Sequence, residues 1–428
     1  MSDALGSLIS QSIGSEREQI LTRNADDFYE RLKSLDDENQ SIRVVKNNAL
    51  LLPMDHVLQL LNTTPAEAWE AARMERRYLP VAKTIAKMTA EPSVRPGRSV
   101  ITRLFRAMPV EVAERALRIR PEGFIWPTGE QWRALFISSF FAHPAAKNFW
   151  LQFVDSATAL NGEMQRKNGA VSLWYQYAAS PLVSRFGCPA FRIACTAQTE
   201  IIADNEESFD DPILMKCHSA DVISVLLRIV AWHIADIVVT DFWDMVKQDA
   251  QTDLVPLESL LPKFDENTNA WSNPTLSALE HLASWCGWQR KGMAITYLGK
   301  LWARHTVSGS TEATSRMRVL RNWTQRKKGR PKFSSLLDLA NAAVSERCMT
   351  DGVDPNHHDR DAKTQAAILR WAETLALLLA YLEFQGLSVR EISEVMSTYS
   401  DEYRTARRIL GKPMNPVDEG RAASSGSA

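Results

Sequence analysis

The sequence has few cysteines, and they lack the spacings that cysteine-based structure requires. Five cysteines are scattered over 428 residues, and no Cys-x-x-Cys pair occurs. The odd number and the spacing argue against a disulfide framework and against a zinc finger or zinc ribbon. They favour a reducing compartment, so we expect a cytoplasmic protein.

Familiar catalytic and targeting signals are also missing. The chain contains no GxxxxGK[ST] phosphate loop, no GxGxxG after a strand, no GxSxG and no HExxH. Residues 1–19 have neither a basic start nor a long apolar run, so we expect no signal peptide. These absences favour a non-enzymatic protein, with no catalytic residue and no cofactor expected.

One long apolar run is present, from Val222 to Thr240, but it carries Arg228, His233 and Asp236. An arginine or aspartate near the centre of a bilayer costs about 2.5–3.5 kcal/mol on insertion scales. We therefore interpret this run as a buried core element and expect no membrane partner.

Helix signals dominate the chain. Capping boxes, in which a Ser or Thr is followed three residues later by Glu or Gln, begin at Ser15, Thr64, Thr128 and Ser388. Alternating apolar runs bounded by turn residues are scarce, and the β-branched run at 236–240 is the best strand candidate. We predict an all-α (mainly α) fold with two or three helical subdomains and little or no β structure.

Polar segments divide the chain into four predicted regions. Breaks fall at residues 90–99, 204–212, 265–274, 307–314 and 349–360. We place an N-terminal helical region at 1–90, a central helical core at 100–306 and a C-terminal helical region at 315–412. Residues 413–428 are small and polar, which predicts a disordered tail.

Positive charge is concentrated in residues 316–332. Eight of these seventeen residues are Lys or Arg and none is acidic, whereas the whole chain has a formal net charge of −1. Such a local concentration suits an element that contacts phosphate. In residues 316–323, arginines interleave with apolar residues as on a helix with one buried side. Residues 326–332 are expected to be the exposed part.

The sequence Lys327-Lys328-Gly329-Arg330-Pro331-Lys332 resembles the AT-hook, a minor-groove element built on Arg-Gly-Arg-Pro with basic flanks. Glycine and proline keep such a segment narrow, and arginines reach into the negative potential of the groove. Here a lysine, which lacks the planar fork of arginine, replaces the first arginine. A plain basic surface loop is the alternative. The nucleic-acid-binding residues predicted here are Arg326, Lys327, Lys328, Arg330 and Lys332.

Two segments have the rhythm of a helix-turn-helix. In the C-terminal one, helices at 387–396 and 403–410 would flank a turn at 397–402, and Arg404, Arg407 and Arg408 would face phosphate or base edges. The N-terminal one covers residues 54–74. Neither turn contains glycine. A plain helical hairpin is the alternative for the C-terminal segment.

Histidine and aspartate recur at helical spacing in His218-x-x-Asp221 and His233-x-x-Asp236. If one helix carries both pairs, they lie on nearly the same face, and imidazole with carboxylate can bind a metal or relay protons. A buried His233 hydrogen-bonded to Asp236 is the alternative. Because no second ligand set is identifiable, no metal site is assigned.

Together these patterns predict a non-enzymatic helical protein that contacts DNA as a subunit of a larger DNA-acting assembly, with protein partners. Two alternatives stay open. One is a helical interaction scaffold without nucleic acid, whose arginines pair with an acidic protein surface. The other is a metal-dependent enzyme that uses the region of His218 and His233.

Overall fold

A computed structural model gives the structure of the chain. It describes residues 17–30, 50–52, 57, 60, 97–107, 110, 132–133, 135–166, 170–191, 196–199, 212–241, 257–288, 290, 292–306, 310–325, 330–351 and 358–411. These residues are mainly helical, and the strands among them form a single two-stranded hairpin. The prediction of an all-α fold is therefore confirmed.

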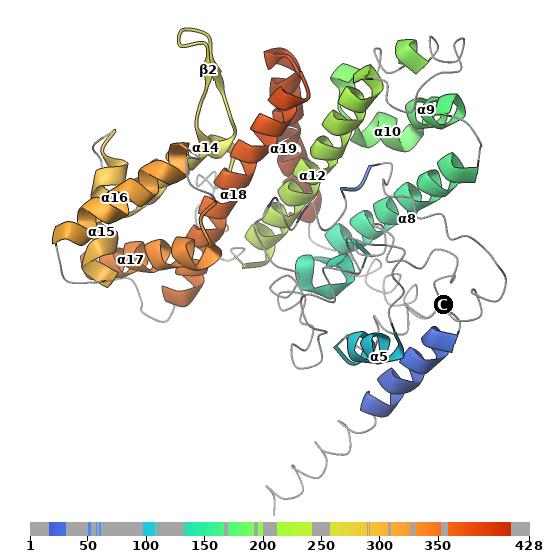
Figure 1. Cartoon of the computed structure of the whole chain (residues 1–428), viewed down its shortest axis with the longest axis horizontal. Coiled ribbons are helices and arrows are strands. Elements are labelled where there is room, and N and C mark those ends of the chain that lie inside the picture. The colour runs from blue at the N-terminus through green and yellow to red at the C-terminus, as the bar shows by residue number, and fades with distance from the viewer. Residues whose placement is uncertain are drawn as a thin grey trace, which may run out of the picture.

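The first part of the chain contributes the helices on the right of Figure 1. They are α5 (Arg98–Ala107), the π-helix η3 (Phe136–Phe140), α8 (Pro144–Arg166), α9 (Ala170–Ala179), α10 (Pro181–Phe186), the 3-10 turn η4 (Pro189–Phe191) and α12 (Pro212–Asp241). Residues 17–30 are also helical, and Phe28 packs on Phe105 of α5 with ring centroids 5.2 Å apart.

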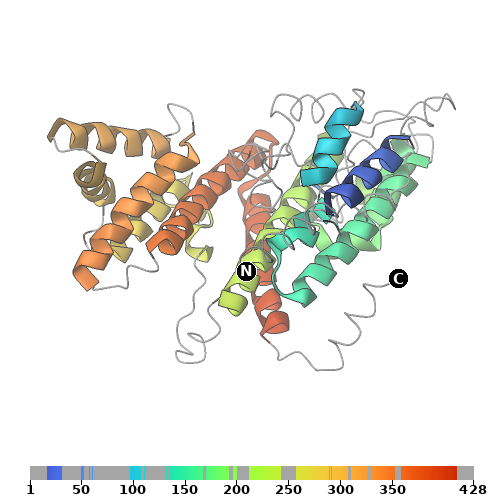
Figure 2. The ribbon, with the colours of Figure 1, turned by 90° about the horizontal axis from the view of Figure 1, so that it is seen from below.

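The second part begins with the 3-10 turn η5 (Glu258–Leu260) and a hairpin of β1 (Phe264–Asp265) and β2 (Ala270–Trp271). It continues with α14 (Pro274–Trp285), α15 (Ala294–Thr306), α16 (Ser310–Gln325), α17 (Phe333–Asp351), α18 (His358–Phe384) and α19 (Val389–Leu410). Helices α14 to α17 form a group on the left of Figures 1 and 2, and α12, α18 and α19 lie between this group and α8.

Helix α12 is the central element because it is apolar on all sides, as expected of a helix enclosed by others. Most of its side chains are buried, and it packs along α19. The run at 236–240, the best strand candidate in the sequence, is helical and belongs to the end of α12. Burial of Val238 and Val239 between helices outweighs their intrinsic strand preference, which is worth only tenths of a kcal/mol per residue.

A buried ion pair joins α12 to α19. Glu402 on α19 accepts hydrogen bonds from the Arg228 guanidinium and, at 2.7 Å, from the indole Nε1–H of Trp232, both on α12. Arg228 also donates to the backbone oxygen of Phe186 at the end of α10, at 3.2 Å. One carboxylate and one guanidinium thus connect three helices.

The predicted C-terminal helix-turn-helix was wrong, because Val389–Leu410 is one continuous helix. Buried residues continue at helical spacing through the expected turn, including Met396, Tyr399 and Tyr403. The hydroxyls of Ser397 and Thr398 donate to backbone oxygens three residues earlier, so the polar residues of the expected turn are accommodated within the helix. The capping box at the start of α19 is present as predicted, with Ser388 and Glu391 bonded reciprocally.

The hydrophobic core crosses the predicted region limits. One cluster of buried residues runs from Leu50 to Leu410 and includes members of α8, α12, α14, α15, α17, α18 and α19. The expected break at 265–274 contains the β1–β2 hairpin, and α16 already begins at Ser310 within the expected break at 307–314. The four regions themselves stay a prediction.

Within the described part of the chain, one helix, Pro212–Thr240 of α12, is long and apolar enough to cross a membrane by length and composition. Its side chains are mostly buried against other helices, an arrangement that the core helix of a folded domain also shows.

Replacing Glu402 with alanine should lower the free energy of unfolding by about 3–5 kcal/mol, because it leaves the nearly buried guanidinium of Arg228 without its carboxylate. Glu394→Ala is the matched control on the same helix, since its partner Arg390 has a side chain that is 89% exposed. That change should cost no more than about 1 kcal/mol. Urea unfolding of both variants measures the difference, and equal losses would contradict the role given to the buried pair.

Candidate nucleic-acid interface

The structure describes five of the eight predicted nucleic-acid-binding residues, and these five fall into two places on the fold. Arg326, Lys327 and Lys328 lie outside the described residues, between the end of α16 and Arg330. Arg330 and Lys332 precede α17, whereas Arg404, Arg407 and Arg408 lie near the end of α19. Almost all of the N-terminal helix-turn-helix candidate at 54–74 also lies outside the described residues.

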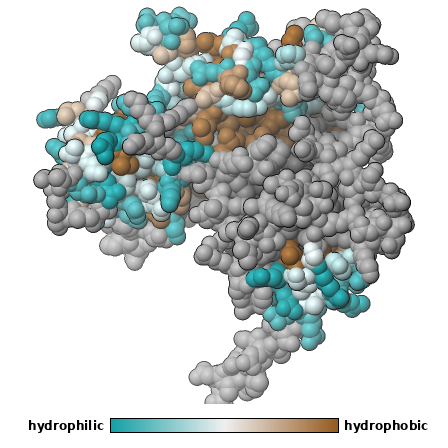
Figure 3. Space-filling model, viewed as in Figure 1, coloured by the Kyte–Doolittle hydropathy of each residue, from teal (hydrophilic) through white to brown (hydrophobic). Residues whose placement is uncertain are grey.

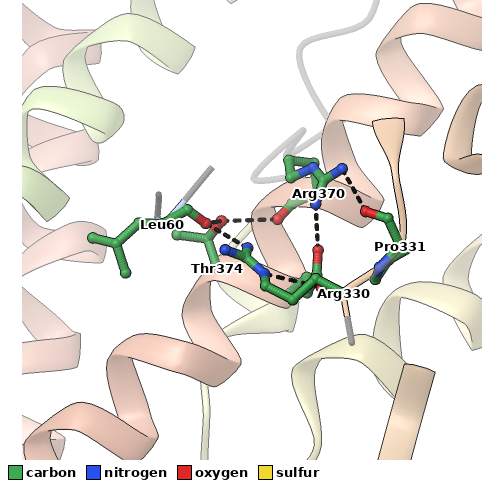
Figure 4. Close-up of polar contacts among 6 residues, drawn as sticks. Leu60, Arg330, Pro331, Arg370 and Thr374 are labelled. Carbon is green, nitrogen blue, oxygen red and sulfur yellow. Dashed lines mark hydrogen bonds and ion pairs between the residues drawn. The ribbon is translucent and has the colours of Figure 1, made fainter. Parts of the chain in front are cut away.

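Arg330 is held by the fold. Its Nε lies 3.2 Å from Oε1 of Glu373 on α18, and its Nη2 donates to the backbone oxygen of Leu60 (Figure 4). The same Leu60 oxygen accepts from the hydroxyl of Thr374 at 3.1 Å. Arg330 therefore joins α18 to a residue from the N-terminal part of the chain.

The neighbouring proline is also anchored. Pro331 is buried, and its backbone oxygen accepts from Nη2 of Arg370 at 2.8 Å (Figure 4). Nη1 of Arg370 lies 2.6 Å from Oε2 of Glu373, so the two oxygens of Glu373 each meet a different arginine. This arrangement places a buried carboxylate between two guanidiniums, which largely satisfies its charge.

These contacts correct the expectation that residues 326–332 are exposed throughout. In an AT-hook-like element the arginine before proline must reach into a groove, yet Arg330 points to Glu373 and Leu60, with a side chain only 23% exposed. Lys332 keeps an exposed side chain, and its backbone oxygen accepts from the first turn of α17. The Arg-Pro pair thus fixes one end of the basic segment.

The arginines near the end of α19 have carboxylate neighbours. Arg404 lies 3.1 Å from Glu258 and 3.2 Å from Asp401, with a side chain that is 62% exposed. Arg407 is half-buried and Arg408 is exposed. Helix α19 lies against α12 in the middle of the molecule, whereas α16 lies in the outer group, so these arginines are on a different part of the fold from α16 (Figures 1 and 2).

Helix α16 matches the predicted amphipathic helix. Leu320 and Trp323 are buried, whereas Arg318 and Arg321 are exposed and pair with no carboxylate among the described residues. Arg316 differs from them, since its guanidinium lies 4.3 Å from the ring centre of Trp302 and its Nε lies 2.8 Å from Glu312. It therefore contributes to packing rather than to an open surface.

The structure adds two cations that the sequence reasoning missed, Lys300 and Arg304 on α15. Both are exposed, although Nη2 of Arg304 lies 3.2 Å from Oε1 of Glu346 on α17, and α15 packs closely against α16. Gly299 permits this approach, because a Cβ there would lie 3.0 Å from the backbone nitrogen of Met317. Helix α15 contains no acidic residue and α16 contains only Glu312. The i, i+4 spacing of Lys300 and Arg304 on a helix without acids was the signal available in the sequence.

One helix, α12, carries both histidine–aspartate pairs, but the aspartates bind other groups. Asp221 accepts from the hydroxyl of Tyr177 at 2.8 Å and from the backbone N–H of Cys188 at 2.6 Å. Asp236 accepts from the backbone N–H groups of Ala142 and His143, at 2.6 and 2.8 Å, just before α8. Both carboxylates thus satisfy backbone donors between helices.

Neither histidine forms a metal cluster with these aspartates. His233 is buried and stacks on Phe140 with ring centroids 4.0 Å apart. Within the part of the chain that the structure describes, no three His, Cys, Asp or Glu side chains are placed to hold a metal ion. The geometry gives the metal-dependent alternative no site there.

A third reactive group, the thiol of Cys286, is similarly enclosed. It lies 3.6 Å from the backbone oxygen of Ala343, and burial raises its pKa to about 12. The thiolate, which is the nucleophilic form, is therefore scarce at neutral pH.

Comparison with known proteins identifies no relative of this chain. The chain matches no protein-family model, no curated protein and no solved structure. The candidate interface is therefore argued from its own contacts and charges.

Arg330→Ala should lower the free energy of unfolding by about 1–3 kcal/mol, because the change removes a donor to Glu373 and to the Leu60 oxygen. Lys332→Ala, two residues away on an exposed side chain, should change it by less than about 0.5 kcal/mol. Chemical denaturation of the two variants measures both free energies of unfolding and so distinguishes a side chain that anchors the fold from a cation on the surface. The anchoring role fails if both variants are as stable as the parent.

His233 should make the protein less stable as the pH falls below about 6.5. Burial lowers the pKa of His233 in the folded state, and the smaller effects of Asp236 and of a hydrogen bond with the backbone of Phe140 oppose this. Below about pH 6.5 the unfolded chain binds a proton at His233 that the folded chain does not bind. The contribution of His233 to the free energy of unfolding is therefore fully present above the pKa of the unfolded state, and it is lost as the pH falls towards the pKa of the folded state.

His233→Phe keeps a ring against Phe140 and removes this titration. Between about pH 7.5 and about pH 5.5, the free energy of unfolding of this variant should fall less than that of the parent protein, by up to about 1.4 kcal/mol per pH unit. Urea unfolding at three pH values measures the two slopes. Parallel slopes would show that His233 does not titrate differently in the folded state.

Proposed function

We propose that the protein is a non-enzymatic, DNA-contacting subunit that binds the phosphate backbone through a basic surface on the α15–α16 hairpin. On the hairpin this basic surface consists of Lys300, Arg304, Arg318 and Arg321. We include in the proposal Lys332, just before α17, and Arg326, Lys327 and Lys328, which lie outside the described residues. The observation that carries the proposal is the charge imbalance of the hairpin. Its exposed cations stand on two helices whose single acidic residue, Glu312, pairs with Arg316. Arg304 also meets a carboxylate from a neighbouring helix, Glu346 on α17 at 3.2 Å, and its side chain stays 60% exposed.

The anchoring of Arg330 supports the inclusion of the neighbouring cations in the proposed DNA-binding surface. Residues 326–329 connect Gln325, the end of α16, with Arg330, which Glu373 and the Leu60 oxygen hold in place. Three cations are thus tied at both ends to described elements. Cations carried on a restrained segment lose less conformational entropy when they bind phosphate than cations on an unrestrained tail.

Phosphate contact fits these residues better than reading of base edges. Lysine and arginine side chains spread over a helical hairpin neutralise phosphates and release counterions irrespective of sequence. The one arginine of the AT-hook-like segment that adjoins proline is engaged by Glu373. We therefore expect binding that depends strongly on salt and weakly on DNA sequence.

Membership of a larger assembly remains part of the proposal, as does the cytoplasmic location expected from the cysteines. A scaffold without nucleic acid is the second candidate. Its support is the exposure of large apolar side chains away from the basic surface, above all Phe384 at 86%. The two candidates differ in what the cations do, so nucleic-acid binding decides between them.

Lys300→Ala/Arg318→Ala/Arg321→Ala should weaken binding to a fluorescent DNA duplex and flatten its salt dependence. The slope of log K against log salt should fall by about 0.9 for each phosphate contact removed. Fluorescence anisotropy at several salt concentrations gives both quantities. Duplexes of unrelated sequence should bind with similar affinity, and a single-stranded RNA of equal length tests whether DNA is preferred.

The matched control is Arg23→Ala/Arg103→Ala/Lys263→Ala, which removes three exposed positive charges from elsewhere on the surface. It should retain the affinity and the slope of the parent protein. If both triple variants lose affinity equally, the assigned surface is wrong. If the parent protein binds no nucleic acid at about 50 mM salt, DNA contact itself is wrong, because phosphate-driven binding is strongest at low salt.

A further inference from the structure

Two aromatic side chains, Trp288 and Tyr297, stack on each other where α14 ends and α15 begins. Their ring centroids lie 4.6 Å apart, with an angle of 12° between the ring planes. Both side chains are half-buried, whereas Trp302 and Trp323 in the same group of helices are only 1% and 7% exposed. The stack therefore reaches the surface, where its rings can contact a ligand as well as each other. Trp288 and Tyr297 are called the aromatic platform below.

The backbone next to the aromatic platform is fixed by hydrogen bonds and bordered by open space. Gly287 has a φ of 84°, and its N–H donates to the backbone oxygen of Ser284. The N–H of Trp288 donates to Ala283, so α14 closes with a Schellman ending that holds Trp288 in place. Gly287 and Gly292 are both exposed, and a Cβ on either one would meet no atom within 4 Å beyond its chain neighbours.

Helix α15 carries two cations in line with the aromatic platform. Tyr297, Lys300 and Arg304 are spaced by three and four residues, so they lie along one face of the helix. Lys300 is exposed, and Arg304 stays 60% exposed although it pairs with Glu346. Burial raises the pKa of Tyr297, and the charge of nearby Arg304 partly opposes this rise. Tyr297 and Arg304 are about 10 Å apart along the helix axis, the length of about three stacked nucleotides.

A third cation, Arg290, lies beside the indole of Trp288. Its guanidinium is 5.9 Å from the ring centre, and its side chain is exposed. The packed contact of Arg316 with Trp302 measures 4.3 Å, so Arg290 is not in close face contact with its indole. An exposed guanidinium in this position can stack on a planar ligand and can also bind a phosphate.

The charge of the surrounding helices indicates what the aromatic platform binds. Residues 274–351, which contain α14 to α17, include thirteen Lys or Arg and five Asp or Glu, whereas the whole chain has a formal net charge of −1. On the left of Figure 3, the described residues of this group are mainly hydrophilic. Such a surface attracts a polyanion. A nucleic-acid strand with unpaired bases also offers flat rings that stack on aromatic side chains, whereas a duplex keeps its base faces inside the stack.

We propose that the aromatic platform binds unpaired bases of a DNA strand whose phosphates follow Lys300 and Arg304 along α15. The inference rests on the proposed DNA contact and adds a substrate class to it, DNA with single-stranded regions. One base stacks on the aromatic platform, and Arg290 closes over it. Stacking uses the face of a base and not its edges, so binding stays tolerant of DNA sequence.

The test measures binding of the full chain to a fluorescent single-stranded oligothymidylate and to a blunt duplex of equal length, by fluorescence anisotropy. Trp288→Leu should weaken binding of the single strand at least about fivefold, the lower limit for losing one base–aromatic stack. Binding of the duplex should change by less than about twofold, because its phosphate contacts are unaltered. Trp288→Phe keeps a ring and should retain most of the affinity for the single strand.

Trp271→Leu is the matched control. Trp271 is also half-buried, but it precedes α14, whereas Trp288 follows that helix. The change should leave both affinities at the values of the parent protein, and circular dichroism verifies that every variant is folded.

Cross-linking locates the bound base without any variant. Ultraviolet irradiation of the parent protein with a strand that contains bromodeoxyuridine should link the base to Trp288 or Tyr297, and mass spectrometry of the peptides identifies the linked residue. Cross-links confined to other residues would overturn the inference. So would single-strand binding that Trp288→Leu leaves intact or that Trp271→Leu weakens equally.

The same measurements separate this inference from the proposed function. A parent protein that binds the duplex but not the single strand would show that the role of the aromatic platform is wrong, while the phosphate-binding surface stands. A parent protein that binds neither probe at about 50 mM salt would overturn both.

Discussion

The buried contact of Glu402 with Arg228 and Trp232 is the constraint on which the middle of the molecule depends. Helix α12 is apolar enough to pack against many partners, and hydrophobic burial alone is not directional. A carboxylate that must meet both a guanidinium and an indole N–H admits only one register of α19 on α12. Arg228 also bonds the end of α10, so the same charge places the helices on both sides of α12. Removing either charge leaves the other buried without its partner, so we expect the two charges to act as a unit.

A second buried carboxylate, Glu373, has a comparable effect on the outer group of helices. It lies between Arg330 and Arg370, and Arg370 also binds the backbone of Pro331. The segment with the strongest resemblance to a DNA-binding motif is thus fastened to α18 at its Arg-Pro end. The proposed interface changes accordingly. Its cations lie on the α15–α16 hairpin and on the residues between the hairpin and the anchor, and Arg330 supports them.

Local sequence patterns predicted the helices well. The capping box at Ser388 and Glu391 begins α19, and the arginines of 316–321 lie on an amphipathic helix. Predictions failed where a local pattern competed with burial. Polar residues at 397–402 suggested a turn, but the apolar spacing through Tyr399 and Tyr403 keeps them helical. The β-branched residues near Val238 suggested a strand for the same reason, since propensity differences are smaller than the free energy of burying the side chains.

The sequence by itself determined the helical class and the concentration of positive charge at 316–332. These features depend on the spacing of residues along the chain, because helix geometry decides from that spacing which residues share a helix face or lie at a helix end. Only the tertiary structure decided which charges are available. Arg330 pairs with Glu373, which is 43 residues away in the sequence. Lys300 and Arg318 lie on two neighbouring helices, and Gly299 allows these helices to approach closely. The reason is physical: whether a cation is neutralised depends on carboxylates within a few ångströms in space, and their distance along the chain does not reveal this.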